Sequence, residues 1–441
     1  MLSIRKTALA VLLPVLLQAC AVHQQNVNSL AERLEFSPPE ATLVSLQLFT
    51  PPGRDRGQYL LNTGLLRSIT GDFEGANRDL QDAKNILNAL QATSVSENLG
   101  AAVVNETLRS YDGSASERVL LHVLLSINYL MLNNLDAARV EVLQADVVMK
   151  ELAREDKPIG QLASAHYIAG LIYELGGELD DAMISYRKAA NIMALRNMSP
   201  PPALKKTLLS LSQRLGLDDE YTKYREQFDS AVKPPTPDAA EIVVIYWDGV
   251  VTSKRGNSLS VWEPTLNQAV SLALPYYPPS NYVKKPFKLR MDGQRHRTGI
   301  IEDVEALLRE DLDDESAAIY AMTLARIVNK YNLVKSAGNE NDSLGKLINI
   351  ATMLSESADT RSWNMLPSTI QIACFSLPAG EYSLPYPNYS RSRREELAET
   401  KLAVSAGEKI VLFVPGVSRK IFSYTLASRV KPKRKKIEAV K

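Results

Sequence analysis

The stretch 161-QLASAHYIAGLIYELGGELDDAMISYRKAANIMALR-196 predicts two helices folded back on each other. Small and aromatic residues recur at helical spacing on both sides of the Gly176-Gly177 pair, which interrupts the pattern. These residues are Ala165, Ala169, Gly170, Tyr173, Ala182, Tyr186 and Ala189. A lone helix pair cannot bury its apolar stripe, so this stretch requires further pairs stacked beside it.

Two earlier segments, Arg56–Leu90 and Glu117–Lys150, carry the same pattern. The three segments share their offsets when they are aligned on the small residues Ala76, Ala138 and Ala182. A small residue on the first helix, a turn residue seven positions later and alanines on the second helix resemble the tetratricopeptide repeat.

We therefore expect a mainly α fold, with a tetratricopeptide-like helical array over residues 41–232. A fourth helical piece, Pro202–Phe228, turns at Gly216 and is suited to cap the stack.

The resemblance implies a groove that is lined by the first helices and binds an extended peptide or a helix. Mapping that face onto this chain gives Gln58, Leu61, Leu65, Ser68, Ser164, Tyr167, Leu171 and Glu174. Interior packing is the simpler explanation of the leucines. The candidates for contact with an envelope protein or peptide are therefore Gln58, Ser68, Ser164, Tyr167 and Glu174.

Residues 1–19 have the layout of an export signal, with Arg5 and Lys6 ahead of an apolar run. The ending Leu17-Gln18-Ala19-Cys20 resembles a bacterial lipobox, which implies that Cys20 carries a lipid anchor and that residues 20–40 form a tether. An ordinary secretory signal with a chance cysteine is the alternative. By the same resemblance, Ala21 after the cysteine favours the outer membrane, with the protein facing the periplasm.

Composition excludes several classes of function. Lys and Arg number 51 against 50 Asp and Glu, so the chain lacks the positive charge that nucleic-acid partners require. The four histidines do not cluster, and no motif predicts a metal or a cofactor. Cys374 lies in an apolar run and reads as a small core residue, with a nucleophile as the less favoured alternative.

A second domain is expected after the proline-rich linker 233–239. Residues 240–428 predict a β-rich, sandwich-like domain with a helical insertion at about 301–358. One helix of this insertion is expected to begin at Glu315, after Asp313-Asp314, and Asp248-Gly249 is expected to turn a hairpin. The predicted strands are Glu241–Val251, Val270–Leu274, Phe287–Met291, Ile370–Phe375, Gly380–Leu384 and Lys409–Val414.

Asp359, Arg361 and Trp363 form the densest cluster of distinctive residues in this domain. The cluster either binds a ligand carboxylate or pins the insertion to the sheet, with Trp363 in the core. The tail 429–441 is basic, which is typical of a solvated end and also suits contact with anionic lipid or peptidoglycan.

The order of these motifs along the chain resembles an uncharacterised family of Gram-negative lipoproteins. The resemblance rests on the lipobox, Tyr111-Asp112-Gly113, Tyr246-Trp247-Asp248-Gly249, Asp359–Pro367 and Leu377–Tyr382. The family carries no assigned activity. Its members accompany other envelope lipoproteins, which implies a role in cell-wall assembly.

Three functions follow. The preferred one is a membrane-tethered periplasmic adaptor that binds an envelope protein through its repeats. The second is an accessory subunit of a secretion or export machine. The third is a glycan-acting enzyme that uses carboxylates such as Asp248, Glu263 and Asp292, although no catalytic motif is present.

Overall fold

The computed structural model describes residues 23–93, 109–154, 157–228, 239–264, 266–337, 357–385, 399–418 and 420–425. Four expected features lie outside these ranges: the signal sequence with Cys20, the prolines of the linker, residues 338–356 of the predicted helical insertion and the basic tail. Within the described ranges, no helix is both long and apolar enough to cross a membrane.

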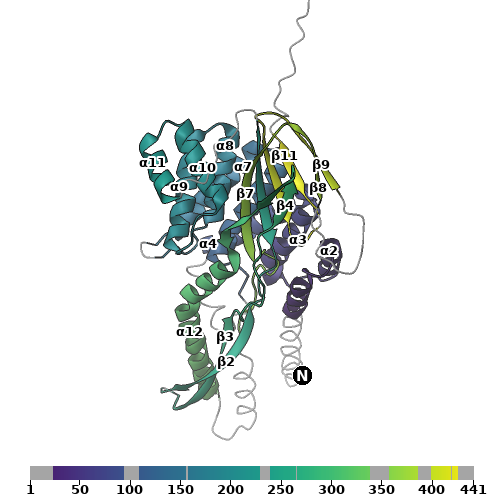
Figure 1. Cartoon of the computed structure of the whole chain (residues 1–441). Coiled ribbons are helices and arrows are strands. Elements are labelled where there is room, and N and C mark those ends of the chain that lie inside the picture. Colours follow the sequence, from purple (N-terminus) through teal and green to yellow (C-terminus); the bar gives the residue numbers. More distant parts are fainter. Residues whose placement is uncertain are drawn as a thin grey trace, which may run out of the picture.

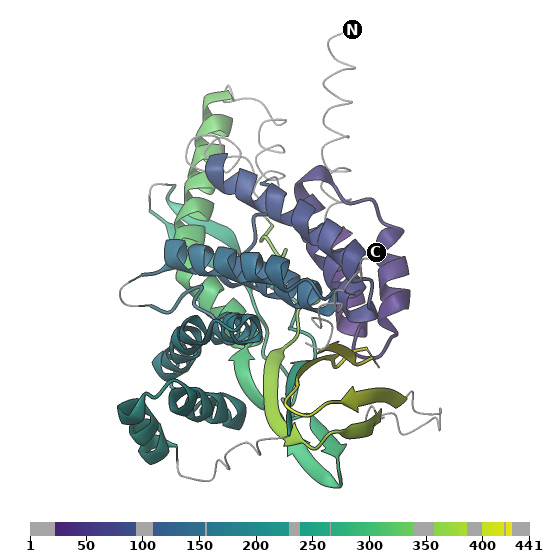
Figure 2. The same ribbon diagram turned by 90° about the horizontal axis from the view of Figure 1, so that it is seen from above.

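The expected helix pairs are present (Figures 1 and 2). They are α3 (Arg56–Thr70) with α4 (Phe73–Thr93), α6 (Ala115–Met131) with α7 (Leu135–Leu152), α8 (Ala163–Gly176) with α9 (Leu179–Leu195), and α10 (Pro202–Arg214) with α11 (Asp218–Gln227). Close approach explains Gly170, because a Cβ there would lie 2.8 Å from Cδ1 of Tyr186.

The folded part begins earlier than expected. Residues 23–33 are helical, and Val27, Ala31 and Leu34 are buried in the core. The helix α2 (Pro39–Gln47) follows and packs on α3. The stretch expected to be a tether is therefore folded from His23 onward, because its apolar residues recur every three to four positions and cover the first pair.

The described residues contain a five-stranded mixed sheet with the order β11-β10-β1-β7-β6. Its strands are β1 (Ala240–Asp248), β6 (Gly299–Asp303), β7 (Thr369–Leu377), β10 (Lys409–Pro415) and β11 (Phe422–Thr425). The central strand β1 runs parallel to β10 and antiparallel to β7. The hairpin expected at Asp248-Gly249 is wrong, because the partners of β1 are remote segments.

A β-sandwich is not confirmed. Figure 2 shows helices on one face of the sheet, whereas two ribbons cover the other face. The ribbons are β4 (Lys288–Met291) with β5 (Gln294–Arg297), and β8 (Gly380–Pro385) with β9 (Glu399–Val404). Residues of β1 alternate between these layers: Val243, Ile245 and Trp247 meet the helices, and Ile242, Val244 and Tyr246 meet the ribbons.

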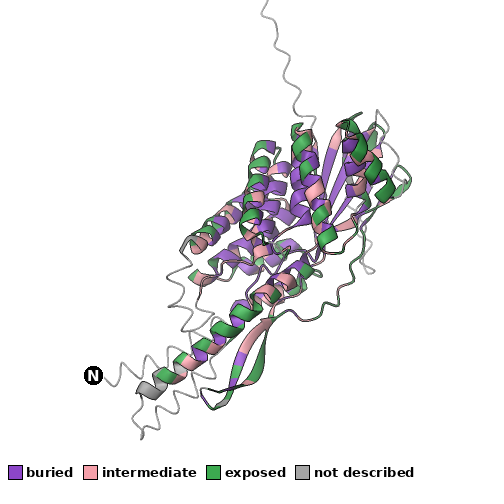
Figure 3. Ribbon diagram, turned by 90° about the vertical axis from the view of Figure 1, so that its left-hand side faces the viewer, coloured by how far each residue is buried: buried purple, intermediate pink, exposed green. Residues whose placement is uncertain are grey.

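The expected helical insertion differs in form. One helix, α12 (Val304–Ala337), follows β6 directly, and the amide N of Ala306 donates to the Asp303 carboxylate over 3.1 Å. The helix runs through Asp313-Asp314, so the predicted start at Glu315 is wrong. It projects from the body together with the hairpin of β2 (Arg255–Glu263) and β3 (Gln268–Tyr276), and Figure 3 shows that much of this projection is exposed.

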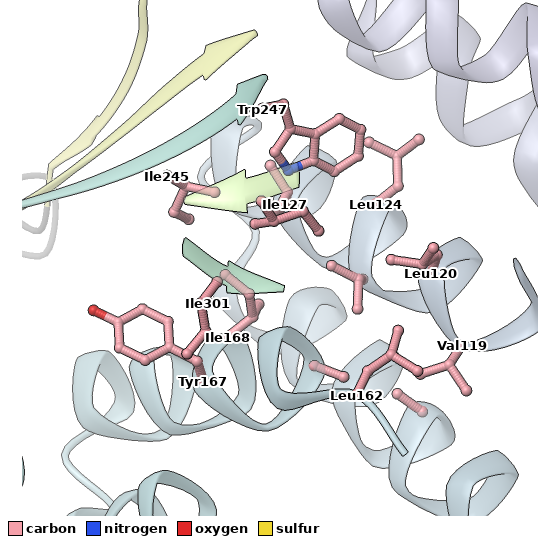
Figure 4. Close-up of a cluster of buried hydrophobic side chains, with 14 of the residues drawn as sticks. Val119, Leu120, Leu124, Ile127, Leu162, Tyr167, Ile168, Ile245, Trp247 and Ile301 are labelled. Carbon is pink, nitrogen blue, oxygen red and sulfur yellow. The ribbon is translucent and has the colours of Figure 1, made fainter. Parts of the chain in front are cut away.

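The helices and the sheet share one hydrophobic core. A single cluster of buried residues extends from the helix pairs to Val243, Ile245 and Trp247 of β1 and Phe413 of β10. Figure 4 shows Ile245, Trp247 and Ile301 of the sheet facing side chains of α6 and α8. The inner surface of the helical array is therefore covered by the second half of the same chain.

Candidate interaction surfaces

The inner face of the array holds the predicted groove residues, and the sheet occupies that groove. Tyr167 is 1% exposed, and the centre of its ring lies 5.4 Å from that of Tyr186. Ser164 lies in the first turn of the same helix, and its amide N and Oγ donate to the Glu302 carboxylate over 2.9 and 3.1 Å. Both residues contact the chain's own sheet layer, which leaves no room for an external peptide.

The inner face of the first helix pair is also covered by the second half of the chain. Gln58 Nε2 donates to the carbonyl of Ser362 and to Oδ1 of Asn364, both over 2.8 Å. Ser68 is fully buried, and its hydroxyl donates to the carbonyl of Gly64 over 2.9 Å. Gln58 therefore positions the segment 359–368 rather than a partner, and the Ser68 hydroxyl is satisfied within α3.

Glu174 is also engaged within the chain. Its carboxylate lies 2.7 Å from Nζ of Lys409 and 2.8 Å from Nη1 of Arg214, and it accepts from the Tyr186 hydroxyl over 3.1 Å. The expectation that the five candidates contact an external partner is therefore corrected. The apolar face of the sheet needs a helical cover, and the array supplies it.

The cluster at Asp359, Arg361 and Trp363 pins the segment 359–368 to the first pair. Arg361 is bidentate to Asp359, with distances of 2.9 and 2.6 Å, and its Nη1 lies 2.9 Å from Asp55, the residue that precedes α3. Burial alone would raise the pKa of Asp359, but the Arg361 guanidinium holds that pKa below its usual range. Each of the three nitrogens of this guanidinium thus donates a hydrogen bond within the chain.

Trp363 lies in the core and is fully buried. Its amide N donates to the Glu117 carboxylate over 2.6 Å, and the same carboxylate accepts from the Ser114 amide over 2.8 Å and from the Tyr111 hydroxyl. Of the two alternatives for this cluster, the geometry supports the pin, but the cluster is attached to the start of α3 and not to the sheet as predicted.

Two buried carboxylates from the second half of the chain lie at the starts of first helices in the array. Glu302 accepts from Ser164 at the start of α8. Asp311 accepts from the Ser116 amide and the Ser114 hydroxyl at the start of α6, over 2.8 and 2.7 Å. Free N–H groups and the helix dipole favour acceptors at these positions. Burial nevertheless raises the pKa of Glu302 to about 7 and that of Asp311 to about 6.

The raised pKa values predict that the protein loses stability as the pH rises. In the folded state both carboxyls keep their protons to a higher pH than they do in the unfolded chain. Their contribution to the free energy of unfolding is therefore complete below about pH 4 and is lost by about pH 8. Glu302→Gln is neutral throughout. We expect this variant to exceed the wild type at pH 8 by roughly 1 to 3 kcal/mol in free energy of unfolding, measured by urea denaturation.

The control for this prediction is the same pair of proteins at pH 4.5, where Glu302 is protonated and the two free energies should converge. A difference between the two proteins that is equal at both pH values would contradict the assignment of the titration to Glu302.

Cys374 is not arranged as a nucleophile. Its thiol donates to the Glu241 carboxylate over 3.0 Å, and burial raises the pKa of the thiol well above its ordinary value. The Lys409 ammonium lies 2.7 Å from the other oxygen of Glu241 and holds the pKa of this carboxyl at about 2, against the effect of burial.

The carboxylates weighed for glycan chemistry lie on three different elements. Asp248 ends β1 and accepts from the hydroxyls of Tyr246 and Tyr282 over 3.0 and 2.7 Å. Glu263 lies at the far end of β2, and Asp292 lies in the turn between β4 and β5. Within the ranges that the structure describes, no group of three or more His, Cys, Asp or Glu could hold a metal ion.

The outer face of α7 carries a signal that the sequence analysis missed. Val140, Leu143 and Val147 follow the helical spacing and are 50%, 42% and 53% exposed. At the same offsets from the aligned alanines, α4 carries Arg78, Gln81 and Asn85, and α9 carries Ile184, Arg187 and Asn191. The second pair is thus apolar where its neighbours are mostly polar, and a comparison of the outer helices could have found this.

Ion pairs place Ile184 of α9 beside this surface. Arg139 and Asp146 of α7 pair with Glu178 and Lys188 next to and within α9, over 2.6 and 3.0 Å. In the sequence, Ile184 lies between Glu178 and Lys188, just as Leu143 lies between Arg139 and Asp146. We define Val140, Leu143, Val147 and Ile184 as the outer patch.

Comparison with known proteins gives no family. No family model and no curated protein match the chain. Among solved structures, the crystal structure of MamA is 16% identical over 43% of this chain and 85% of that chain, with a TM-score of 0.28. The apo form of RapI is 12% identical over 45% of this chain and 66% of that chain, with a TM-score of 0.34. Scores of this size transfer neither family nor function to this chain.

Proposed function

We propose that this protein is a membrane-anchored adaptor that binds an envelope protein through the outer patch. Lipid on Cys20 holds the protein at the outer membrane, facing the periplasm, and the partner belongs to envelope or cell-wall assembly. The lipobox supports the anchor. The observation that supports the binding role is the outer patch, because the groove inside the array is filled by the chain's own sheet.

The outer patch suits the apolar face of an amphipathic helix. Val140, Leu143 and Val147 occupy positions i, i+3 and i+7 of α7, which form one continuous stripe. Ile184 widens that stripe, and the ion pairs between α7 and α9 supply the polar rim typical of protein interfaces. A partner helix with its own apolar stripe would bury these side chains.

Leu143→Glu is expected to abolish binding of the partner, because it puts a charge at the centre of the apolar stripe. The test places a photoreactive amino acid at Val147 in living cells, captures the full-length protein, and compares the crosslinked partner with and without Leu143→Glu. We expect the crosslink to fall at least about tenfold, the loss typical of removing a central contact.

Asn85 provides the matched control, because it occupies in α4 the position that Val147 occupies in α7. A crosslinker at Asn85 should not capture the partner. If both positions capture the same protein, or if Leu143→Glu leaves the crosslink unchanged, the outer patch is not the binding site.

The anchor has its own test. Cys20→Ala should move the protein from the membrane fraction to the soluble periplasmic fraction, because several acyl chains supply the membrane affinity. Retention of Cys20→Ala in the outer-membrane fraction would contradict the lipid anchor.

A further inference from the structure

We infer that the arm of this protein, defined as β2, β3 and the part of α12 beyond Asp314, lies against the surface of a lipid bilayer. The inference rests on the proposed lipid at Cys20. Figures 1 and 3 show the arm projecting from the body, and Figure 3 shows that much of it is exposed.

The exposed residues of α12 between Ser316 and Asn329 are uncharged. Between Ser316 and Asn329 the sequence has a single charged residue, Arg326, and its side chain is buried. The exposed residues of this stretch are Ser316, Ala317, Ala318, Tyr320, Ala321, Met322, Ala325 and Asn329. Exposed helices in water normally carry charges at such positions, as α4, α7 and α9 do.

The hairpin carries a second uncharged surface. No charged residue occurs in Gly256–Trp262 or in Gln268–Tyr276. Trp262 is 62% exposed and Leu259 is 47% exposed, although both are large and apolar. Trp is enriched where a bilayer meets water, since its ring is apolar and its N–H reaches polar groups.

These exposed residues are not needed to hold the arm together. A separate small core of Leu266, Val270, Leu272 and Ile327 joins the hairpin to α12. In the strand register, Trp262 pairs with Ala269, whereas the adjacent pair Val261 and Val270 faces α12. Trp262 therefore points away from the helix, because neighbouring residues of a strand face opposite sides.

The start of the chain brings the bilayer to the base of the arm. Helix 23–33 is fixed there: Glu32 lies 3.2 Å from Arg255, Asn364 donates to Asn28 over 2.7 Å, and Gln24 donates to the carbonyl of Thr360 over 3.4 Å. Cys20 precedes His23 by three positions, so the lipid attachment point lies at most about 10 Å away.

The arm is longer than this tether. From Glu315 to Ala337 the helix extends about 35 Å at 1.5 Å per residue. Figure 1 shows the arm on the same side of the body as the start of helix 23–33. A bilayer held within about 10 Å of His23 by the tether is therefore the first surface that the arm meets.

The test uses the fluorescence of Trp262. Of the three tryptophans, Trp247 and Trp363 are buried in the core, so Trp262 alone is open to a quencher in the membrane. The chain from residue 21, with a hexahistidine tag in place of Cys20, is tethered to phosphatidylethanolamine and phosphatidylglycerol vesicles that contain a nickel-chelating lipid. Lipids with brominated acyl chains should then remove most of the Trp262 emission.

The control places the exposed tryptophan on a different surface of the protein. In Trp262→Phe with Leu143→Trp the exposed tryptophan lies on the outer patch, and bromination should leave its emission unchanged. Equal quenching at both positions, or none at Trp262, would overturn the inference. The artificial tether makes this result independent of acylation in cells, which the fractionation of Cys20→Ala decides separately.

Discussion

Replacing Arg361 with methionine is expected to lower the free energy of unfolding by about 3 to 5 kcal/mol, because the buried Asp55 and the partly buried Asp359 lose the guanidinium that pairs with both. Arg361 is 7% exposed and lies between Asp55, which precedes α3, and Asp359, which follows the arm. Its removal leaves Asp359 without the guanidinium that pairs with it, leaves Asp55 with Arg54 alone at 3.8 Å, and frees the segment 359–368 from the first helix pair. Urea denaturation at pH 7 measures the loss.

The triple variant Arg361→Met, Asp55→Asn and Asp359→Asn is the control. It removes the charges together with the cation, so it should recover much of the lost stability. A loss below about 1 kcal/mol for Arg361→Met alone would show that the pair behaves like an exposed salt bridge, and the proposed pin would be wrong.

Trp363→Ala is expected to cost about 3 to 5 kcal/mol, the range for deleting a large aromatic side chain from a core. Trp363 is fully buried and is the largest of the fully buried side chains that the structure describes. Trp262→Ala is the matched control. It deletes the same side chain from an exposed position, so we expect a change within about 0.5 kcal/mol.

Both proteins are compared with the wild type by urea denaturation. Equal losses for the two tryptophans would contradict the assignment of Trp363 to the shared core. A similar midpoint with a lower dependence on urea would instead indicate that the unfolding is no longer a single transition.

The helix pairs could be predicted because their signals are local. Ala76, Ala138 and Ala182 mark places where two helices touch, and Gly170 leaves space for the ring of Tyr186. Such contacts join residues that lie less than two helical turns from the short loop between the two helices. The helical periodicity of the sequence alone is therefore enough to predict the pairs. Several strands were predicted as well, the clearest from the apolar, β-branched runs at Glu241–Val251, Ile370–Phe375 and Lys409–Val414.

The pairing of the strands could not be predicted. β1 pairs with β10, more than 160 residues later, and with β7, beyond the whole arm. The hydrophobic pattern of a strand shows which faces are buried and says little about its neighbours. The continuous apolar run from Ile242 to Trp247 is typical of a strand buried on both faces, a signal that the sandwich prediction did not use.

The groove residues were misassigned because their chemistry does not reveal what they contact. Ser164 and Tyr167 have the positions of partner-binding residues in the resembled repeat, and they do bind a protein surface, which is the sheet of the same chain. Asp313-Asp314 misled for a similar reason. A pair of acids that resembles a helix start instead binds Arg154 and Lys157 through Asp314, both over 2.7 Å.

The central claim is that the inner face of the array is closed by the chain's own sheet, and the labelling of a cysteine at Ser164 tests it most directly. In the chain from residue 21 with Cys374→Ser, Ser164→Cys and Asn85→Cys provide one buried and one exposed thiol. The closed groove predicts that the thiol at 164 reacts with a thiol reagent at least about a thousandfold more slowly, because labelling requires the sheet to separate from α8. Reaction of the two thiols at similar rates under native conditions would show that the groove is open, and the account would be wrong.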